Sequence, residues 1–319
     1  MMPLIISVPM FLLSCAAMYM ASQILVQALG RIAIFLKWRE FILAFFLMAF
    51  GVSIPNFFVA VMSAIRGVPE LSYGDVIGGN IFDLSFALGL AAVLSKKGIE
   101  AKSRTVSTSV LFTIAATMLP ILLVFDKTLS RLDGVFLIIV YLIYSAWLFS
   151  DKDRFTLDQS SNRKIIKKSE LIRDFLLAVL GIFILLLGAK GIVDSSISFS
   201  DNFAIPLGII GVLIVSVGNC LPETFFSVQA AKSKQEWMIL GNLMGGVVVC
   251  TTLVIGIAAI IHPINIDGLS TFVLARIFLV MSIILFYTCI RTDQKITKKE
   301  GVYLLLLYFI FIFLEIIMY

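Results

Sequence analysis

Long hydrophobic stretches, separated by short polar connections, run along the chain. A helix of about 20 apolar residues crosses a hydrocarbon core of roughly 30 Å, so each stretch is interpreted as one membrane-spanning helix. The alternation of apolar and polar positions typical of a membrane β-barrel is missing, so we expect an all-α polytopic membrane protein. The ten predicted helices cover residues 4–29, 40–65, 71–95, 105–125, 132–150, 174–197, 204–231, 237–261, 268–290 and 301–319.

The composition agrees with this interpretation. Of the 319 residues, 60% are hydrophobic and 14% are charged, and the mean hydropathy is +1.06. These values lie far outside the range of soluble globular proteins. The ten spans leave no room for a separate soluble domain, and the lipid bilayer is the expected surrounding of most of the chain.

The net charge of +5 reflects where the basic residues lie rather than a nucleic-acid partner. Of the 25 Lys and Arg residues, 20 fall in or beside alternate connections between predicted helices. Basic residues favour the cytoplasmic side of a membrane. We therefore expect these connections to face inward and both termini to face outward, in the plasma membrane. The sequence identifies no protein partner.

The longest polar connection, Asp151–Glu170, separates five predicted helices from five. This division predicts a first five-helix repeat at 1–150, a cytoplasmic linker at 151–173 and a second five-helix repeat at 174–319.

The two halves also share a sequence pattern. Residues 51–92 align with residues 218–259 without a gap, at a constant offset of 167. Five is an odd number, so the second repeat enters the membrane from the opposite side. The chain is thus predicted to hold two inverted repeats, the architecture of alternating-access secondary transporters. Matching positions include Gly51 and Gly218, Pro55 and Pro222, Phe58 and Phe225, Gly78 and Gly245, and Gly89 and Gly256.

In both repeats a Gly-x-x-x-Pro element lies inside a hydrophobic span. Proline removes a backbone donor and clashes with the preceding turn, so we expect both helices to break near the membrane midplane. Free backbone groups at that depth are tolerated only where they line a wet cavity or coordinate an ion. Breaks at matching positions therefore point to a substrate site at the midplane.

Two acidic side chains, Asp83 and Glu223, lie in the middle of predicted spans. Such a group costs about 2.5 to 3.5 kcal/mol on insertion scales, and no Lys or Arg lies mid-span to offset it. A bound cation or a proton must neutralise both groups. Carboxylate, amide and carbonyl oxygens suit hard ions such as Ca2+ and Na+. The alternative is that both acids are protonated and hydrogen-bonded in a packed core.

Four segments around these residues carry a recognisable pattern: GVSIPNFFVAVMSAIRG, GDVIGGNIFDLSFALGL, GNCLPETFFSVQAAKSK and GNLMGGVVVCTTLVIGI. They resemble the two α-repeats of the sodium/calcium exchanger (cation/Ca2+ antiporter) superfamily. The family pattern is Gly-Thr-Ser-Leu-Pro-Glu, followed by Gly-Asn-Val-Ile-Gly-Ser-Asn-Ile-Phe-Asn or Asp. The resemblance covers the whole chain and implies α-repeats at about 43–94 and 210–261.

Several ligand positions depart from that pattern. Asn56 replaces the glutamate of the first repeat, whereas Glu223 keeps that of the second. Asp83 keeps an acidic or amide position, and Cys250 stands at the counterpart of Asp83. Two potential anionic ligands are therefore lost. The two negative charges of the remaining carboxylates balance the charge of one divalent ion, of two monovalent ions or of two protons.

Serines that resemble sodium ligands are replaced by Gly79 and Gly246, which removes two further hydroxyl groups. The resemblance implies a secondary antiporter, without a cofactor, that exchanges Ca2+ or a related cation for Na+ or H+. The implied cation ligands are the carboxylates of Asp83 and Glu223, the amides of Asn56 and Asn219, the Ser53 hydroxyl and backbone carbonyls near Val52 and Asn219. Cys220 and Cys250 occupy two further family ligand positions, and Asp83, Glu223 and Asn56 are the expected metal ligands.

Two alternatives stay open. Cys220 and Cys250, with the two acids, would make a softer site for Zn2+ or Mn2+ in a transition-metal or proton-coupled exchanger. The missing ligands would equally suit a non-transporting membrane scaffold with decayed ion sites. An enzyme is not expected, because Ser53 has no histidine partner in its span and His262, the single histidine, lies at a helix end. Four other acids lie near span ends, where we expect water to reach them: Glu40, Glu70, Asp75 and Glu315.

Overall fold

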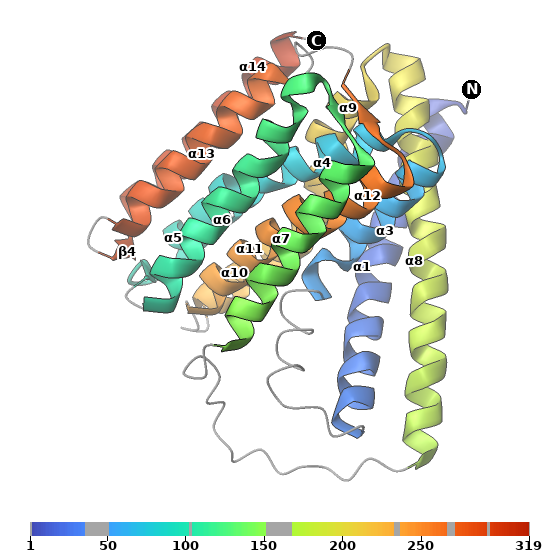
Figure 1. The fold of residues 1–319 in the computed structure, drawn as a ribbon, viewed down its shortest axis with the longest axis horizontal. Coiled ribbons are helices and arrows are strands. Elements are labelled where there is room, and N and C mark those ends of the chain that lie inside the picture. The colour runs from blue at the N-terminus through green and yellow to red at the C-terminus, as the bar shows by residue number, and fades with distance from the viewer. Residues whose placement is uncertain are drawn as a thin grey trace.

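The computed structural model describes residues 2–35, 51–101, 104–150, 168–232, 237–266, 272–291 and 294–318, which form a bundle of tilted helices (Figure 1). The first half holds α1 (Leu4–Phe35), α3 (Gly51–Ile65), α4 (Pro69–Ile81), η2 (Phe82–Ala87), α5 (Leu88–Leu94), α6 (Arg104–Leu123), η3 (Val124–Asp126) and α7 (Arg131–Ser150). The second half holds α8 (Lys168–Phe203), α9 (Leu207–Ile210), η5 (Gly211–Val215), α10 (Ser216–Lys232), α11 (Trp237–Val248), η6 (Val249–Val254), α12 (Ile255–Ile261), α13 (Val273–Arg291) and α14 (Lys298–Met318).

Three spans each consist of shorter elements that together form one continuous helix. In each, a π-helical turn joins two α-helical segments: η2 joins α4 to α5, η5 joins α9 to α10, and η6 joins α11 to α12. Within the described ranges, nine helices are long and apolar enough to cross a membrane, in line with nine of the ten predicted spans. Of the other predicted span, the structure describes α3, in which Ser53–Ile65 is a shorter apolar helix. Residues 40–50 of that span, and most of the predicted linker, lie outside the described residues.

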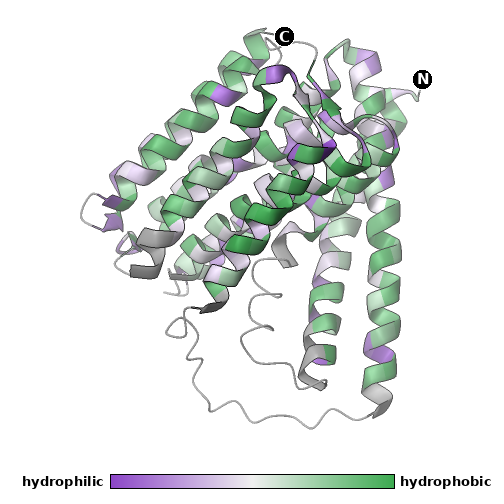
Figure 2. Ribbon diagram, viewed as in Figure 1, coloured by the Kyte–Doolittle hydropathy of each residue, from purple (hydrophilic) through white to green (hydrophobic). Residues whose placement is uncertain are grey.

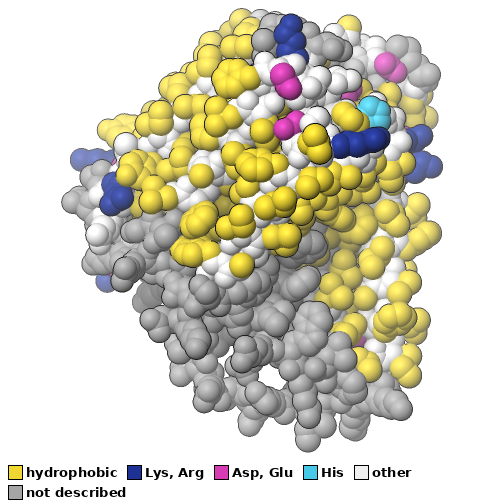
Figure 3. All heavy atoms as spheres, in the orientation of Figure 1, with side chains coloured by type: hydrophobic (Ala, Val, Ile, Leu, Met, Phe, Trp, Pro, Cys, Tyr) yellow, Lys and Arg dark blue, Asp and Glu magenta, His cyan; other side chains and the backbone are white. Residues whose placement is uncertain are grey.

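The surface fits a lipid environment. Hydrophobic residues dominate the long helices on the outside of the bundle (Figure 2). On the face shown in Figure 3, hydrophobic side chains cover the middle, and the charged side chains lie mostly towards the upper and left edges. The interior instead holds buried polar groups, including Asp75, Asp83 and Glu223. Asp83 and Glu223, which sequence analysis placed at membrane depth, therefore face the protein and not the lipid.

Helices α1 and α8 form a long antiparallel pair at one side of the bundle (Figure 1). With 36 residues, α8 is about 54 Å long at 1.5 Å per residue, which exceeds the thickness of a hydrocarbon core. Polar contacts join the pair near both ends. The Arg31 guanidinium approaches both carboxylate oxygens of Asp174 at 2.9 Å, and the Ser7 and Ser198 hydroxyls lie 2.8 Å apart.

The Asp174 carboxylate is the buried member of that ion pair, with 1% of its side chain exposed. We expect Asp174→Asn to lower the free energy of unfolding by about 1.5–3 kcal/mol, because charged hydrogen bonds are lost while the Arg31 charge remains. Thermal unfolding of the detergent-purified protein measures this effect. Asp201→Asn, at an exposed position of the same helix, is the control and should change stability by less than about 0.5 kcal/mol. Equal stability of the two variants would show that the ion pair contributes nothing.

Local structure repeats at the offset of 167 that aligns the two halves. The π-helical turn Phe82–Ala87 has its counterpart at Val249–Val254, and the strand β2 (Thr128–Leu129) has its counterpart at β4 (Lys295–Ile296). These strands pair with β3 (Ile264–Asn265) and β1 (Ile99–Glu100) of the other half, respectively. Each half thus contributes one strand to each two-stranded sheet.

Helix caps and helix–helix contacts also recur 167 residues apart. Asp133 accepts hydrogen bonds from the backbone N–H and hydroxyl of Ser130, and 167 residues later Glu300 accepts the same pair from Thr297. Glycines let α5 approach α14 and α12 approach α7: a Cβ at Gly89 would lie 2.7 Å from the Gly301 carbonyl oxygen. Repetition of such details at one offset supports the interpretation of a duplicated chain.

Matching helices run in opposite directions. In Figure 1, α1 descends from the N-terminus at the upper right, whereas its counterpart α8 ascends from the bottom. Both termini lie at the upper end of the same view, as an even number of crossings requires. This arrangement is the one that an inverted repeat would produce.

The expected unwinding at the two Gly-x-x-x-Pro elements is wrong. Helix α3 is continuous through Pro55, and α10 is continuous through Pro222. Each proline removes only one helical hydrogen bond, the one to the carbonyl four residues earlier at Gly51 or Gly218, and the neighbouring helices hold the rest. The irregular backbone lies instead at the π-helical turns, one of which contains Asp83.

Candidate functional site

The two acids that sequence analysis singled out lie on neighbouring elements of opposite halves. Asp83 lies on η2 and Glu223 on α10, and these elements pack against each other. Asp83 is 7% exposed and Glu223 is 4% exposed. Their carboxyl groups are close enough to interact electrostatically. The structure therefore brings the two predicted ligands together inside the protein.

Asp83 has a thiol as its neighbour. Its carboxyl group is hydrogen-bonded to Cys220, which lies one turn before Glu223 on α10. A Cβ added at Gly79 would lie 3.1 Å from the Cys220 sulfur. A serine at position 79, as the family pattern has, would therefore crowd the Cys220 thiol. The two departures from the pattern fit each other sterically.

A second group of predicted ligands lies where α3 meets η6. Asn56 donates a hydrogen bond from its amide nitrogen to the Cys250 sulfur at 3.2 Å, and Cys250 is also hydrogen-bonded to Ser53. All three side chains are buried. The Asn56 carbonyl oxygen has no hydrogen-bond partner among the residues that the structure describes, so it is available as a ligand.

These two groups are counterparts under the offset of 167. Ser53, Asn56 and Cys250 match Cys220, Glu223 and Asp83, in that order. One group carries no acid, and the other carries two. We call them the neutral group (Ser53, Asn56 and Cys250) and the acidic group (Cys220, Glu223 and Asp83). The charge of the candidate site is therefore concentrated on one side of the duplication.

Asp75 lies close enough to the acidic group to interact with it electrostatically. The expectation that water reaches Asp75 is wrong. Its side chain is 1% exposed, and its carboxylate accepts a hydrogen bond of 2.9 Å from the Asn219 amide. Helices α9, α10 and α13 and the turn η5 all pack on α4 and cover the residue. The position of Asp75 near a span end in the sequence gave no sign that these elements bury it. Glu315 is also fully buried, at 0% exposure, although it too lies near a span end.

Several oxygens of the site have no hydrogen-bond partner in the part of the chain that the structure describes. These buried oxygens are Asp83 Oδ1, Glu223 Oε2 and Asn56 Oδ1. Buried polar atoms in proteins are usually satisfied by a protein group or by water, so these three oxygens are free to accept a hydrogen bond from water or to bind a cation. Among the described residues, no group of three or more His, Cys, Asp and Glu side chains converges as a ready metal cluster. A cation here would need the amide, hydroxyl or backbone oxygens as well.

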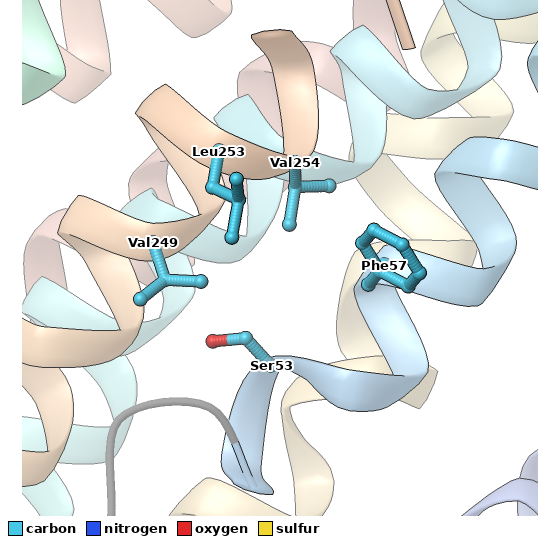
Figure 4. Close-up of a pocket in the computed structure, with 5 residues that line it drawn as sticks. All are labelled: Ser53, Phe57, Val249, Leu253 and Val254. Atoms are coloured by element: carbon cyan, nitrogen blue, oxygen red, sulfur yellow. The ribbon is translucent and has the colours of Figure 1, made fainter. Parts of the chain in front are cut away.

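The neutral group borders a narrow gap. Ser53 and Phe57 on α3 face Val249, Leu253 and Val254 on η6 (Figure 4). The gap is too narrow for a water molecule. Apart from Ser53, the residues that line it carry hydrocarbon side chains.

The remaining predicted ligands are Val52 and Asn219. Val52 lies in the first turn of α3, and Asn219 lies inside α10. Neither sits in unwound backbone, so the carbonyls that lack a helical donor are those of Gly51 and Gly218, four residues before the prolines. Asn219 joins the acidic group through its amide contact with Asp75.

Known proteins resemble this chain over nearly its full length. A family model described as sodium/calcium exchanger protein matches residues 6–150 and 174–317. The sodium/calcium exchanger MaX1 of Methanosarcina acetivorans is 24% identical, over 94% of this chain and 96% of that protein. An uncharacterised membrane protein of Methanocaldococcus jannaschii is 26% identical, over 96% of this chain and 97% of that protein.

A solved structure shares the fold. The sodium-calcium exchanger NCX_Mj, soaked with 10 mM Na+ and no Ca2+, matches with a TM-score of 0.62 and 25% identity. The match covers 97% of this chain and 98% of that chain. Together with the family model, which spans most of the sequence, these findings give the identity. The chain is a multi-pass integral membrane protein that belongs to the sodium/calcium exchanger family.

Proposed function

We propose that the protein is a secondary antiporter that exchanges Ca2+ or a related cation for Na+ or H+ by alternating access. The observation that carries the proposal is the pair of buried carboxyl groups, Asp83 and Glu223, each with an oxygen that has no hydrogen-bond partner among the described residues. Among the described residues, neither acid forms an ion pair with a Lys or Arg. A cation or protons must balance their charge.

The chemistry of the donors favours a hard cation. Asp83 and Glu223 supply charge, and the Asn56 carbonyl oxygen can complete part of the coordination shell. The Cys220 and Cys250 sulfurs are each engaged in hydrogen bonds with Asp83 and Asn56, respectively. Thiols that already take part in hydrogen bonds are less available as ligands of Zn2+ or Mn2+, which favours the hard-ion interpretation over a transition-metal exchanger.

The proposed orientation follows the basic connections: both termini face outward in the plasma membrane. The π-helical turns and the glycine-rich contacts between halves lie around the acids, where two arrangements of the same helices would expose the site to opposite sides in turn. The recurrence of local structure at the offset of 167 supports this mode of transport.

Transport by the purified protein in liposomes tests the proposal. We expect Ca2+ uptake that depends on an outward Na+ or H+ gradient. Asp83→Asn should lower it about 100-fold or more, because one of two charged ligands is lost. Glu100→Gln, at an exposed position in β1, is the matched control and should transport normally.

A screen of Na+, H+, Mg2+, Ca2+, Mn2+ and Zn2+ in the same liposomes separates the alternatives. Transport of Zn2+ or Mn2+ alone, lost in Cys220→Ser with Cys250→Ser, would establish the soft-metal exchanger instead. Absence of both flux and cation-dependent thermal stabilisation would establish the scaffold.

A further inference from the structure

Six basic side chains gather at the end of the bundle where β1 and β4 join the two halves. Ile99 pairs with Ile296 there, and Glu100 pairs with Lys295. In Figure 3, dark blue side chains lie at the left edge, the end at which Figure 1 labels β4. Five of the six are exposed, and Lys295 is half-buried. We call this set the basic patch: Lys96, Lys97, Arg291, Lys295, Lys298 and Lys299.

A tight turn positions the lysines of the first half. The backbone N–H of Lys97 donates a hydrogen bond of 3.3 Å to the Ser95 hydroxyl, which donates one of 3.1 Å to the Gly98 carbonyl. Gly98 has a φ of +81°, in the left-handed region that favours glycine. A Cβ at Gly98 would lie 3.0 Å from Cε of Lys295, so the Lys295 stem packs on this turn. Lysines of both halves are therefore neighbours.

The positive charge is not balanced within the described residues. None of their ion pairs includes a member of the basic patch. Two acids lie in the same region: Glu100 is the cross-strand neighbour of Lys295, and the Glu300 carboxylate accepts hydrogen bonds from Thr297. Six positive and two negative side chains leave a net charge of +4. Like charges on neighbouring side chains repel, so the basic patch favours an anionic partner.

The stability of the fold gives no reason for this charge. The matching sheet of β2 and β3 forms without it, because at the offset of 167 only Lys298 has a basic counterpart, Arg131. The counterparts of the other five are Pro263, Ile264, Val124, Thr128 and Leu132. Lys298 and Lys299 also lie in the first turn of α14, where the helix dipole disfavours positive charge. The positive-inside rule counts basic residues in each connection and does not require two connections to converge.

The basic patch borders the surface that faces lipid. Leu94 at the end of α5, and Val302 and Tyr303 near the start of α14, are exposed by 43%, 44% and 57%, respectively. The Arg291 guanidinium lies 5.5 Å from the centroid of the Tyr287 ring. Tyrosines are typical of the membrane–water interface. Basic groups beside this border lie at the depth of lipid phosphates, which favours a lipid over a soluble acidic protein as the partner.

We propose that the basic patch binds the headgroup phosphates of anionic phospholipids, in the leaflet that the proposed orientation makes cytoplasmic. Each basic residue near an anionic leaflet strengthens such binding about fivefold. The bound lipid contacts both halves, because Lys96 and Lys97 belong to the first half and the other four residues to the second. The inference goes beyond the proposed function and holds whichever cation is transported.

Native mass spectrometry of the detergent-purified full chain, titrated with phosphatidylglycerol or phosphatidylcholine, tests this inference. The wild type should bind phosphatidylglycerol at least about tenfold more tightly than phosphatidylcholine. Lys96→Gln, Lys97→Gln and Lys295→Gln, combined in one variant, should lower the phosphatidylglycerol affinity about 100-fold and leave the phosphatidylcholine affinity unchanged.

Three further variants separate the basic patch from effects of net charge and of folding. Lys96→Arg, Lys97→Arg and Lys295→Arg, combined, keep the charge and should bind phosphatidylglycerol within about threefold of the wild type. Glu100→Gln removes an acid from the region and should raise the affinity about fivefold. Lys127→Gln, Arg131→Gln and Lys232→Gln, combined, remove the same charge from exposed positions elsewhere and should change the affinity by less than about threefold.

Two results for the glutamine variant of the basic patch would overturn the inference: an unchanged phosphatidylglycerol affinity, or a loss that the variant of Lys127, Arg131 and Lys232 matches. Displacement of the lipid by inorganic phosphate at equal concentration would also overturn it, because the basic patch would then recognise a soluble anion. The titration contains no transported cation, so failure of the proposed function leaves its outcome unaffected.

Discussion

Glu223→Gln should abolish cation-dependent stabilisation and, at the same time, make the cation-free protein more stable. The glutamate is 4% exposed and interacts electrostatically with Asp83 and Asp75, and one of its oxygens has no hydrogen-bond partner within the described ranges. Removing its charge relieves burial and repulsion, which we expect to raise the cation-free unfolding free energy by about 1–3 kcal/mol. At a cation concentration about 100 times Kd, the wild type should gain about 2.7 kcal/mol and the variant none.

Thermal unfolding in detergent, with and without Ca2+ or Na+, measures both effects. Glu315→Gln is the matched control. Glu315 is also fully buried, and both of its carboxylate oxygens lack a hydrogen-bond partner among the described residues, but it lies on α14 and takes part in none of the ion pairs that the described residues form. Its replacement should raise cation-free stability in the same way and keep the cation-dependent gain. Loss of that gain in both variants, or in neither, would remove Glu223 from the site.

The sequence alone was sufficient for the architecture. Apolar length predicted nine helices that the structure describes, and the family resemblance is confirmed by the family model and the fold of NCX_Mj. It was also sufficient to select Asp83 and Glu223 as a pair, because uncompensated acids at membrane depth are rare and costly. That these residues bind a cation stays a prediction.

The site was harder to predict where it depends on contacts between halves. Asp75 lies six residues from the start of α4, which in the sequence looks like the edge of a span. Its burial follows from α9, η5 and α13 packing on that end of the helix, which no local pattern encodes. The predicted helix breaks at the prolines were wrong for a related reason. A proline removes one helical hydrogen bond, but the packing around the helix decides whether the backbone unwinds.

Gly74→Ala should be the most destabilising single methyl addition among the matched glycine positions of the two halves. A Cβ at Gly74 would overlap the Gly208 carbonyl oxygen and lie 2.9 Å from its carbonyl carbon. Backbone atoms on α9 cannot rotate away as a side chain can, so α4 and α9 must separate. We expect a loss of about 3 kcal/mol in the free energy of unfolding, at the upper end of typical overpacking costs.

Gly241, the counterpart of Gly74 in the second half, is the control position. A Cβ there meets no atom within 4 Å, so Gly241→Ala should be neutral or stabilise by up to about 1 kcal/mol through helix propensity. Because Gly74 precedes Asp75, separating α4 from α9 should also weaken the hydrogen bond between Asn219 and Asp75. Thermal unfolding of both variants measures the loss of stability. Equal stabilities of the two alanine variants would mean that the backbones of α4 and α9 are not in contact. In that case the packing that buries Asp75 would also be contradicted.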